Sequence, residues 1–184
     1  KMIRELAHAK INLALDVVKK RKDGFHELQM IMVPIDLFDT LEFELADVIT
    51  LESDVEIENN SVVKAAKLMQ TRFKIDQGAK IKLSKKIPIG AGLGGGSADI
   101  SATLRGLNKL WDLNLELEDL EGLALELGSD TLFCLHDKPA LVYGRGESLL
   151  FVDTPQIESI YLLISDVNVS TANVFKNYKG KYKT

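Results

Sequence analysis

The chain has 184 residues, a formal net charge of −4 and a sequence pI near 5.5, and 46% of its residues are hydrophobic. These values are typical of a globular domain and exclude a largely disordered chain, and the acidic balance gives no indication of a nucleic-acid partner. The single cysteine, Cys134, excludes an internal disulfide and a zinc site built from several cysteines. No apolar run approaches the roughly 20 residues that span a bilayer, so we expect a cytoplasmic protein with no membrane partner.

The N-terminal part of the sequence has the patterns of strands. Residues 9–18 are mostly apolar with polar residues interspersed, and residues 22–24, Lys-Asp-Gly, are typical of a turn. Residues 28–35 form an apolar run, whereas 40–45 and 48–57 alternate between apolar and polar positions. We therefore expect this part of the chain to be rich in β structure.

The middle of the sequence has the patterns of helices. Apolar residues recur at helical spacing over 61–73, 98–110 and 117–127, and Gly128 is a suitable C-cap for the last of these. One alternating segment, 79–83, predicts a strand between the first two helices.

The C-terminal part is mixed. Residues 132–135 and 140–143 predict two short strands, or a strand and a loop, and 160–165 predicts a buried strand. A short helix is expected over 172–178, and Asp-Thr-Pro within 152–157 indicates a weak boundary. Because strands and helices do not alternate regularly along the chain, the pattern favours an α+β fold over a doubly wound parallel sheet.

A glycine-rich loop, Pro88–Ser97, is the sharpest local feature, with five glycines between Gly90 and Gly96. Glycine allows positive φ and a close approach of backbone N–H groups to a ligand, and the helix that follows offers its positive dipole end. Ser97 could cap that helix or offer its hydroxyl to a phosphate. No Lys-Ser/Thr pair follows as in a Walker A loop, and no parallel strand ending in an acidic residue follows as in a Rossmann unit. The loop predicts phosphate binding of another kind.

A few charged or ring-bearing residues are candidates for chemistry. Lys10 lies in an apolar strand segment, and Asp130 precedes a buried segment, where a carboxylate could act as a general base or hold a cation. His26 lies in a turn beside an aromatic residue and could hold a flat base. On spacing alone, solvated residues at the ends of elements remain strong alternatives for all three. The basic spots at 85–86 and 176–183 are expected to be solvated surface.

Four stretches, taken together, resemble the GHMP kinase superfamily, and the match runs over about residues 6–175. The stretches are Ala9–Leu13 with Asp23–Glu27, Asn60–Ala66, Lys86–Asp99, and Gly128–Asp130 through Gly144–Glu147. The glycine loop alone matches the superfamily, and the Asp-Gly-Phe-His-Glu and Gly-Arg-Gly-Glu stretches narrow the match to the branch that acts on a cytidine diphosphate-linked methylerythritol.

The resemblance implies ATP-dependent phosphorylation of the 2-hydroxyl of that small molecule, with magnesium accompanying ATP. By motif, Asp130 would be the catalytic base and Lys10 its charged partner. Asn12 would help to hold the substrate, and Phe25 and His26 would bind the cytosine ring. No residue is assigned as a direct metal ligand.

The resemblance also assigns ATP binding to the glycine loop and to two residues near the nucleotide. The residues concerned are Asn60, Lys86, Pro88, Ile89, Gly90, Ala91, Gly92, Leu93, Gly94, Gly95, Gly96, Ser97 and Ala98.

The implied architecture is an ATP-binding domain like domain 2 of ribosomal protein S5 over residues 1–154, with a ferredoxin-like substrate domain beginning at 155–184. Phe25 stands where the family has a tyrosine, and Thr131-Leu132 stand where it has an aliphatic residue and a proline. Roughly the last third of the family pattern, including its late glycine-rich motif, is absent from these 184 residues. Another GHMP kinase acting on homoserine or a mevalonate-type acceptor, and a catalytically silent nucleotide-binding module, therefore stay open as alternatives. Homodimer formation also stays open.

Overall fold

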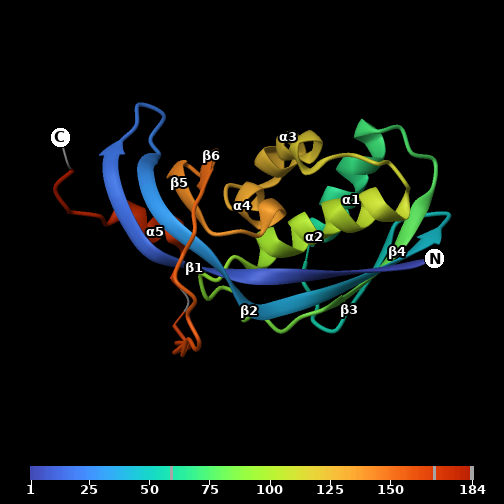
Figure 1. Cartoon of the computed structure of the whole chain (residues 1–184), viewed down its shortest axis with the longest axis horizontal. Helices are drawn as coiled ribbons and strands as arrows, with labels where there is room; N and C mark the ends of the chain where they lie inside the picture. Colours follow the sequence, from blue (N-terminus) through green and yellow to red (C-terminus); the bar gives the residue numbers. More distant parts are fainter. Residues whose placement is uncertain (59, 168, 183–184) are drawn as a thin grey trace.

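The computed structural model describes residues 1–58, 60–167 and 169–182. Its centre is one sheet with the strand order β3-β4-β2-β5-β6, to which β1 adds by pairing with β2. Helices α1 to α4 lie together on one side of the long strands (Figure 1). This α/β arrangement agrees with the predicted mixture of strands and helices.

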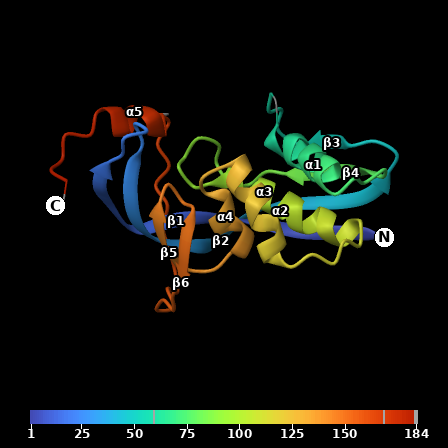
Figure 2. The ribbon, with the colours of Figure 1, turned by 90° about the horizontal axis from the view of Figure 1, so that it is seen from above.

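A long antiparallel hairpin of β1 (Met2–Lys20) and β2 (His26–Ala46) runs the length of the molecule (Figures 1 and 2). The predicted strand at 9–18 is confirmed and extends in both directions. The two segments predicted at 28–35 and 40–45 are one continuous strand.

Pro34 interrupts the hydrophobic pattern of β2 without ending the strand, because it lies at an irregularity. Phe38 and Pro34, four positions apart on β2, face His8 and Lys10, which are two positions apart on β1. A proline is tolerated at such a bulge, where a ladder hydrogen bond is already missing.

The remaining strands are short. β3 (Thr50–Ser53) runs parallel to β4 (Gly78–Ser84), whereas β5 (Ala140–Gly144) and β6 (Ser148–Phe151) form a hairpin. The strand predicted at 48–57 is thus shorter at both ends, and just after its C-terminal end the carboxylate of Asp54 accepts the N–H of Lys85. β6 was not predicted, since most of its side chains are exposed and show no alternation.

Three helices follow the predicted periodicity: α1 (Ser61–Arg72), α2 (Gly95–Leu110) and α3 (Leu117–Leu127). α2 begins three residues before its predicted start at 98. Gly128 follows α3 as its C-cap, as predicted. None of the helices in the described residues combines the length and the hydrophobicity that a membrane crossing requires.

Two segments differ from the prediction. Residues 131–136 form a helix, α4 (Thr131–His136), and not a strand. Its residues from Thr131 to Leu135 are all buried. A run of this kind has no alternation of apolar and polar positions by which a strand could be distinguished from a helix. Residues 160–165 have no strand, and Tyr161 and Leu163 are 95% and 100% exposed. The short helix predicted at 172–178 is present as α5 (Thr171–Lys176).

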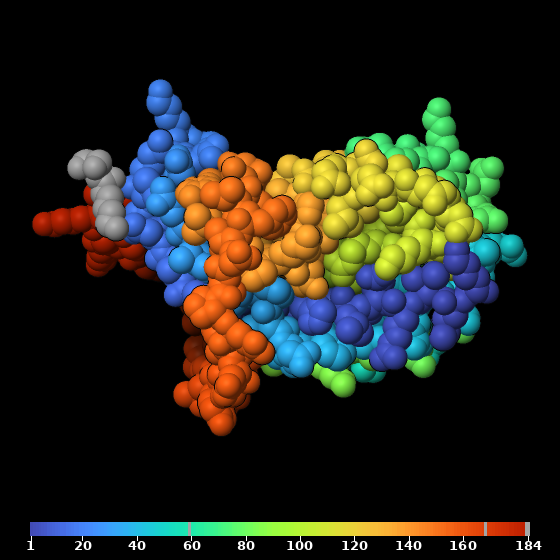
Figure 3. All heavy atoms as spheres, viewed as in Figure 1, coloured from blue at the N-terminus to red at the C-terminus, as the bar shows by residue number. Residues whose placement is uncertain are grey.

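The core fills the space between the sheet and the helices. Phe43 on β2 is fully buried, and a Cβ at Gly106 of α2 would lie 2.3 Å from its ring, so only glycine allows this approach of helix and sheet. All buried hydrophobic residues in the described part of the chain lie between Ala7 and Val142. The segment directly after β6 projects from this body as a narrow arm, coloured orange in Figure 3, and the later part of the segment returns to the β1–β2 hairpin, where Phe175 contacts His26.

Candidate active site

The glycine-rich loop joins β4 to α2, and its backbone has the conformation that the glycines predict. Gly90, Gly92 and Gly94 have φ values of 73°, 76° and 70°. Gly94 is the N-cap residue of α2. The cap predicted at Ser97 is therefore wrong: Ser97 lies in the first turn of the helix, which starts early because glycine can adopt the left-handed conformation at position 94. The loop leaves the N-terminal N–H groups of α2 available to an anion.

Lys10 of β1 contacts this loop. Its backbone N–H donates to the carbonyl of Leu93 over 2.9 Å, and its side chain is so close to Gly94 that a Cβ there would be 2.9 Å from Lys10 Cγ. The residue is only 8% exposed. Its Nζ lies 3.7 Å from Oδ2 of Asp130. The structure thus brings together the loop and the two residues that were predicted to carry the chemistry.

Asp130 stands at the N-terminal end of α4, in the N-cap position. Its side chain is 31% exposed, whereas that of Lys10 is 10% exposed. The distance of 3.7 Å is that of an ion pair rather than a short hydrogen bond, so the carboxylate keeps acceptor sites for a ligand. A carboxylate that can accept a proton and an ammonium that can neutralise charge suit phosphoryl transfer to a hydroxyl.

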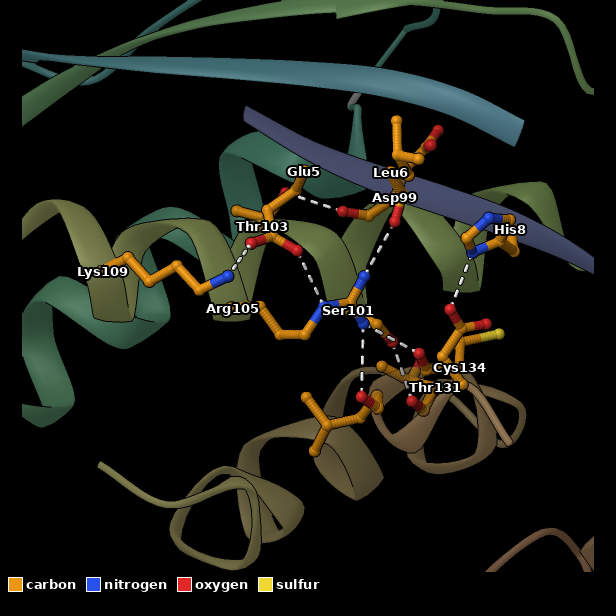
Figure 4. Close-up of polar contacts among 12 residues, drawn as sticks. Glu5, Leu6, His8, Asp99, Ser101, Thr103, Arg105, Lys109, Thr131 and Cys134 are labelled. Carbon is orange, nitrogen blue, oxygen red and sulfur yellow. Dashed lines mark hydrogen bonds and ion pairs between the residues drawn. The ribbon is translucent and has the colours of Figure 1, made fainter. Parts of the chain in front are cut away.

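Contacts with α2 hold α4 in place. The hydroxyl of Ser101 donates to the carbonyl of Thr131 over 2.8 Å. Arg105 lies between β1 and α4 (Figure 4), and it donates to the carbonyls of Leu6, Cys134 and Leu135. α2 therefore positions both the glycine loop at its own start and the helix that carries Asp130.

A buried ion cluster lies at the start of the loop and was missed in the sequence. Lys85 Nζ lies 2.5 Å from Asp39 Oδ2 and 2.8 Å from Asp99 Oδ2, and all three side chains are nearly inaccessible. The other oxygen of Asp39 accepts the backbone N–H groups of Lys86 and Ile87 at 2.6 and 2.8 Å. The prediction that Lys85 is solvated is wrong, because these two carboxylates compensate for its burial. The only signal was the position of Lys85 at the end of a strand, with Lys86 between it and the apolar Ile87.

The cluster shifts two pKa values. Burial raises the pKa of Asp99 to about 7, although the hydrogen bond and the charge of Lys85 lower it. Burial lowers the pKa of Lys85, but the two carboxylates outweigh burial and the net pKa lies above the ordinary value. Asp99 Oδ1 is buried and has no hydrogen-bond partner among the described residues.

The residues predicted to bind cytosine lie near the turn of the β1–β2 hairpin. Phe25 is 50% exposed, and the Arg145 guanidinium lies 3.7 Å from its ring centre. The His26 ring is stacked on that of Phe175, with ring centres 5.2 Å apart, and it also contacts Tyr178 and Tyr182. Phe175 was not singled out in the sequence, because nothing in the pattern of α5 distinguishes it from an ordinary helix residue.

The structure does not bring these aromatic residues into contact with Lys10. His26 faces Lys20, ten positions along β1 from Lys10. Asn12 lies on the same strand between them and is exposed. A single ligand would therefore have to extend along β1 to reach both groups.

Asn60 and Lys86, which were predicted to lie near the nucleotide, make local contacts in the structure. The side-chain oxygen of Asn60 accepts the N–H of Val62 over 2.9 Å and so caps α1. Lys86 is exposed, and its Nζ lies 5.9 Å from the ring centre of Phe38. Neither arrangement tests a contact with ATP.

Comparison with known proteins shows which family this chain resembles. Residues 60–145 match the family model described as the GHMP kinases N terminal domain. Two curated relatives, both 4-diphosphocytidyl-2-C-methyl-D-erythritol kinases, are 48% identical over 96% of this chain (Bacillus pumilus) and 50% identical over 95% of it (Prochlorococcus marinus). The chain spans 63% and 58% of the lengths of these relatives.

The chain is also similar to solved structures of kinases. A crystal structure of 4-(cytidine 5'-diphospho)-2C-methyl-D-erythritol kinase matches 83% of this chain and 56% of its own with a TM-score of 0.74 and 36% identity. Homoserine kinase from Cytophaga hutchinsonii matches 99% of this chain and 61% of its own with a TM-score of 0.63 and 21% identity, a likeness of fold alone.

Proposed function

Because the chain belongs to the GHMP kinase superfamily, we propose that the protein containing it transfers the γ-phosphate of ATP to the 2-hydroxyl of 4-diphosphocytidyl-2-C-methyl-D-erythritol. The reaction belongs to the non-mevalonate route of isoprenoid synthesis. The proposal places the enzyme in the cytoplasm, as a monomer or a homodimer.

One observation carries this proposal: Lys10 contacts both the glycine loop and the carboxylate of Asp130. Its backbone and stem are fixed by Leu93 and Gly94, and its ammonium group faces Asp130. A phosphate bound by the loop and a hydroxyl beside Asp130 would therefore meet at the same lysine. Phosphoryl transfer depends mainly on such positioning and on neutralisation of charge.

In this proposal each residue has a distinct role. Asp130 accepts the proton of the attacking hydroxyl, and Lys10 stabilises the charge that develops on the transferred group. The N–H groups of the loop and of the first turn of α2 hold the ATP phosphates. Magnesium bound with ATP would neutralise part of the phosphate charge.

The aromatic cluster at the hairpin turn would bind the cytosine ring. Phe25, His26 and Phe175 offer ring faces, and the imidazole of His26 offers a hydrogen-bonding edge. The stacked rings of His26 and Phe175 have to separate before a base can lie between them. We therefore add Phe175 to the residues predicted from the sequence.

We also propose that residues 155–184 begin the second, ferredoxin-like domain of the protein. Large apolar side chains of this segment are exposed here and would be buried by such a domain. They are Ile157, Ile160, Tyr161, Leu162, Leu163, Ile164, Val167, Val169 and Val174.

A competition experiment on the full-length protein tests the choice of acceptor. Cytidine 5'-diphosphate should compete with the acceptor and not with ATP, and His26→Ala should weaken that competition about tenfold or more, since base stacking and hydrogen bonding together are worth one to a few kcal/mol. Uridine and adenosine diphosphates are the matched controls. If homoserine or mevalonate supports ADP release and cytidine 5'-diphosphate has no effect, the assigned acceptor is wrong.

A further inference from the structure

α4 is held at both of its ends by β1. It has six residues, too few for a helix to be stable by itself. Asp130 occupies its N-cap position and Asp137 its C-cap position. Asp130 pairs with Lys10 over 3.7 Å, and Asp137 Oδ2 lies 2.7 Å from Nδ1 of His8. The helix that carries the proposed base is thus attached to one strand by the Lys10–Asp130 ion pair and the His8–Asp137 hydrogen bond.

His8 and Lys10 belong to the same irregular part of the hairpin. They are two positions apart on β1, so their side chains share a face of the strand. The bulge of β2 lies opposite them, between Pro34 and Phe38. The His8 ring contacts the edge of the Phe38 ring, with centres 5.5 Å apart. We therefore expect a displacement of His8 to change the position of Lys10.

Charged groups from three elements face His8. Its hydrogen bond to Asp137 raises the pKa above the ordinary 6.5, and the charge of Asp36 in the β2 bulge acts in the same direction. Burial and the charge of Arg105 on α2 lower the pKa but do not reverse the shift. Since the folded-state pKa is raised, the pairing with Asp137 is strongest when His8 is protonated and weakens as the pH rises through that pKa.

Resting on the function proposed above, we propose that His8 and Asp137 are positioning residues that hold α4 so that Asp130 stays beside Lys10, and that loss of the proton from His8 loosens this arrangement. α4 does not depend on His8 to remain folded, because Arg105 also binds its carbonyl groups at Cys134 and Leu135.

His136 provides a matched control. It lies on the same helix, and its Nε2 is 2.7 Å from Oε1 of Glu121 on α3. The His136–Glu121 pair thus has the same chemistry and the same distance as the His8–Asp137 pair, but it joins α4 to a helix that carries no proposed catalytic residue.

The test compares the full-length wild-type protein with His8→Gln and His136→Gln over a range of about pH 5.5 to 8.5, which includes the titration of histidine. At pH 6, His8→Gln should lower kcat about tenfold, since small displacements of a catalytic group are costly, and leave KM for ATP within about twofold. We also expect kcat of the wild type to decline as His8 deprotonates, and His8→Gln should not show this decline. His136→Gln should keep the wild-type profile. The proposal is overturned if His8→Gln keeps the wild-type kcat and profile, or if His136→Gln loses as much activity.

An NMR titration of the His8 ring gives a second readout that does not depend on activity. The pKa of His8 should lie above 6.5 in the wild-type chain and return towards the ordinary value in Asp137→Asn. An ordinary pKa in the wild-type chain overturns the proposal. If the wild-type protein phosphorylates no alcohol acceptor, the proposed function is wrong, and this result is known before any variant is compared. The positioning role of His8 and Asp137 would then be wrong as well.

Discussion

Asp130 and Lys10 are the residues on which the proposed chemistry depends. The carboxylate is partly accessible and the lysine is buried, so a ligand reaches the pair from the side of Asp130. Both were candidates in the sequence, because charged residues beside apolar segments are costly unless they are paired. Their pairing could not be read from the sequence, since 120 positions separate them along the chain.

Replacing the proposed base tests its role directly. In the full-length protein, Asp130→Asn should lower kcat about a hundredfold or more, the usual contribution of a general base, while the ATP dissociation constant changes less than about threefold. Asp112→Asn, at a surface position with a side chain 75% exposed, is the control. Steady-state kinetics and calorimetric ATP binding measure the two effects. Wild-type turnover in Asp130→Asn would show that another group accepts the proton.

Gly94 is the second residue with a clear physical requirement. Its φ is 70°, and a Cβ there would meet the stem of Lys10. Gly94→Ala should lower the free energy of unfolding by about 1–2 kcal/mol from the left-handed conformation alone, with a further loss from the contact with Lys10.

The neighbouring Gly96 is a matched control for that measurement, because a Cβ there meets nothing within 4 Å. Gly96→Ala should leave the free energy of unfolding unchanged or raise it, since alanine favours a helix. Urea unfolding compares the two variants. Equal stability of Gly94→Ala and Gly96→Ala would contradict the described packing of Lys10 against the loop.

At the scale of elements, some helices could be predicted from the sequence, whereas α4 and the ion cluster at the start of the glycine loop could not. Amphipathic helices such as α1 and α3 were predictable because one face is apolar and the other polar. α4 was predicted as a strand because a fully buried segment has no such contrast. The cluster of Asp39, Lys85 and Asp99 was missed because its members come from β2, the loop after β4 and α2, and they come together only after folding.

The Asp99 carboxyl group gives this cluster a measurable pH dependence. Its folded pKa of about 7 lies above the reference value of 3.8, so the folded state binds the proton more tightly than the unfolded state. The resulting stabilisation is fully present below pH 3.8 and is lost as the pH rises through about 7.

Asp99→Asn removes this titration while Lys85 keeps Asp39 as its partner. The wild type should therefore lose stability relative to Asp99→Asn as the pH rises from about 4 to about 7. Denaturant unfolding at several pH values measures that difference, in which other titrating groups largely cancel. A difference that does not vary with pH would mean that Asp99 stays ionised in the fold.

At the scale of the whole molecule, the described chain consists of a packed body and a C-terminal arm. The buried hydrophobic residues end at Val142 in the described part, and most side chains of 155–182 are exposed. The sequence pattern suggested a buried strand at 160–165, because an apolar run looks the same whether or not its partner is present. Most strands and helices of the body were predictable from local patterns, whereas the arrangement of this segment depends on what covers it.

The arm should contribute little to the stability of the body. A chain ending at residue 154 should unfold in one transition with a free energy within about 1 kcal/mol of the 184-residue chain, since few core contacts are removed. Urea unfolding followed by circular dichroism measures this. A loss of several kcal/mol would show that 155–184 belong to the same cooperative unit.

The most direct test of the central claim follows the phosphate itself. The full-length protein is incubated with ATP, magnesium and 4-diphosphocytidyl-2-C-methyl-D-erythritol, and the products are identified by phosphorus NMR. We expect one new phosphomonoester, located on the 2-hydroxyl of the methylerythritol unit, together with an equal amount of ADP. Release of inorganic phosphate with an unchanged acceptor, or binding of ATP without turnover, would contradict the proposed reaction.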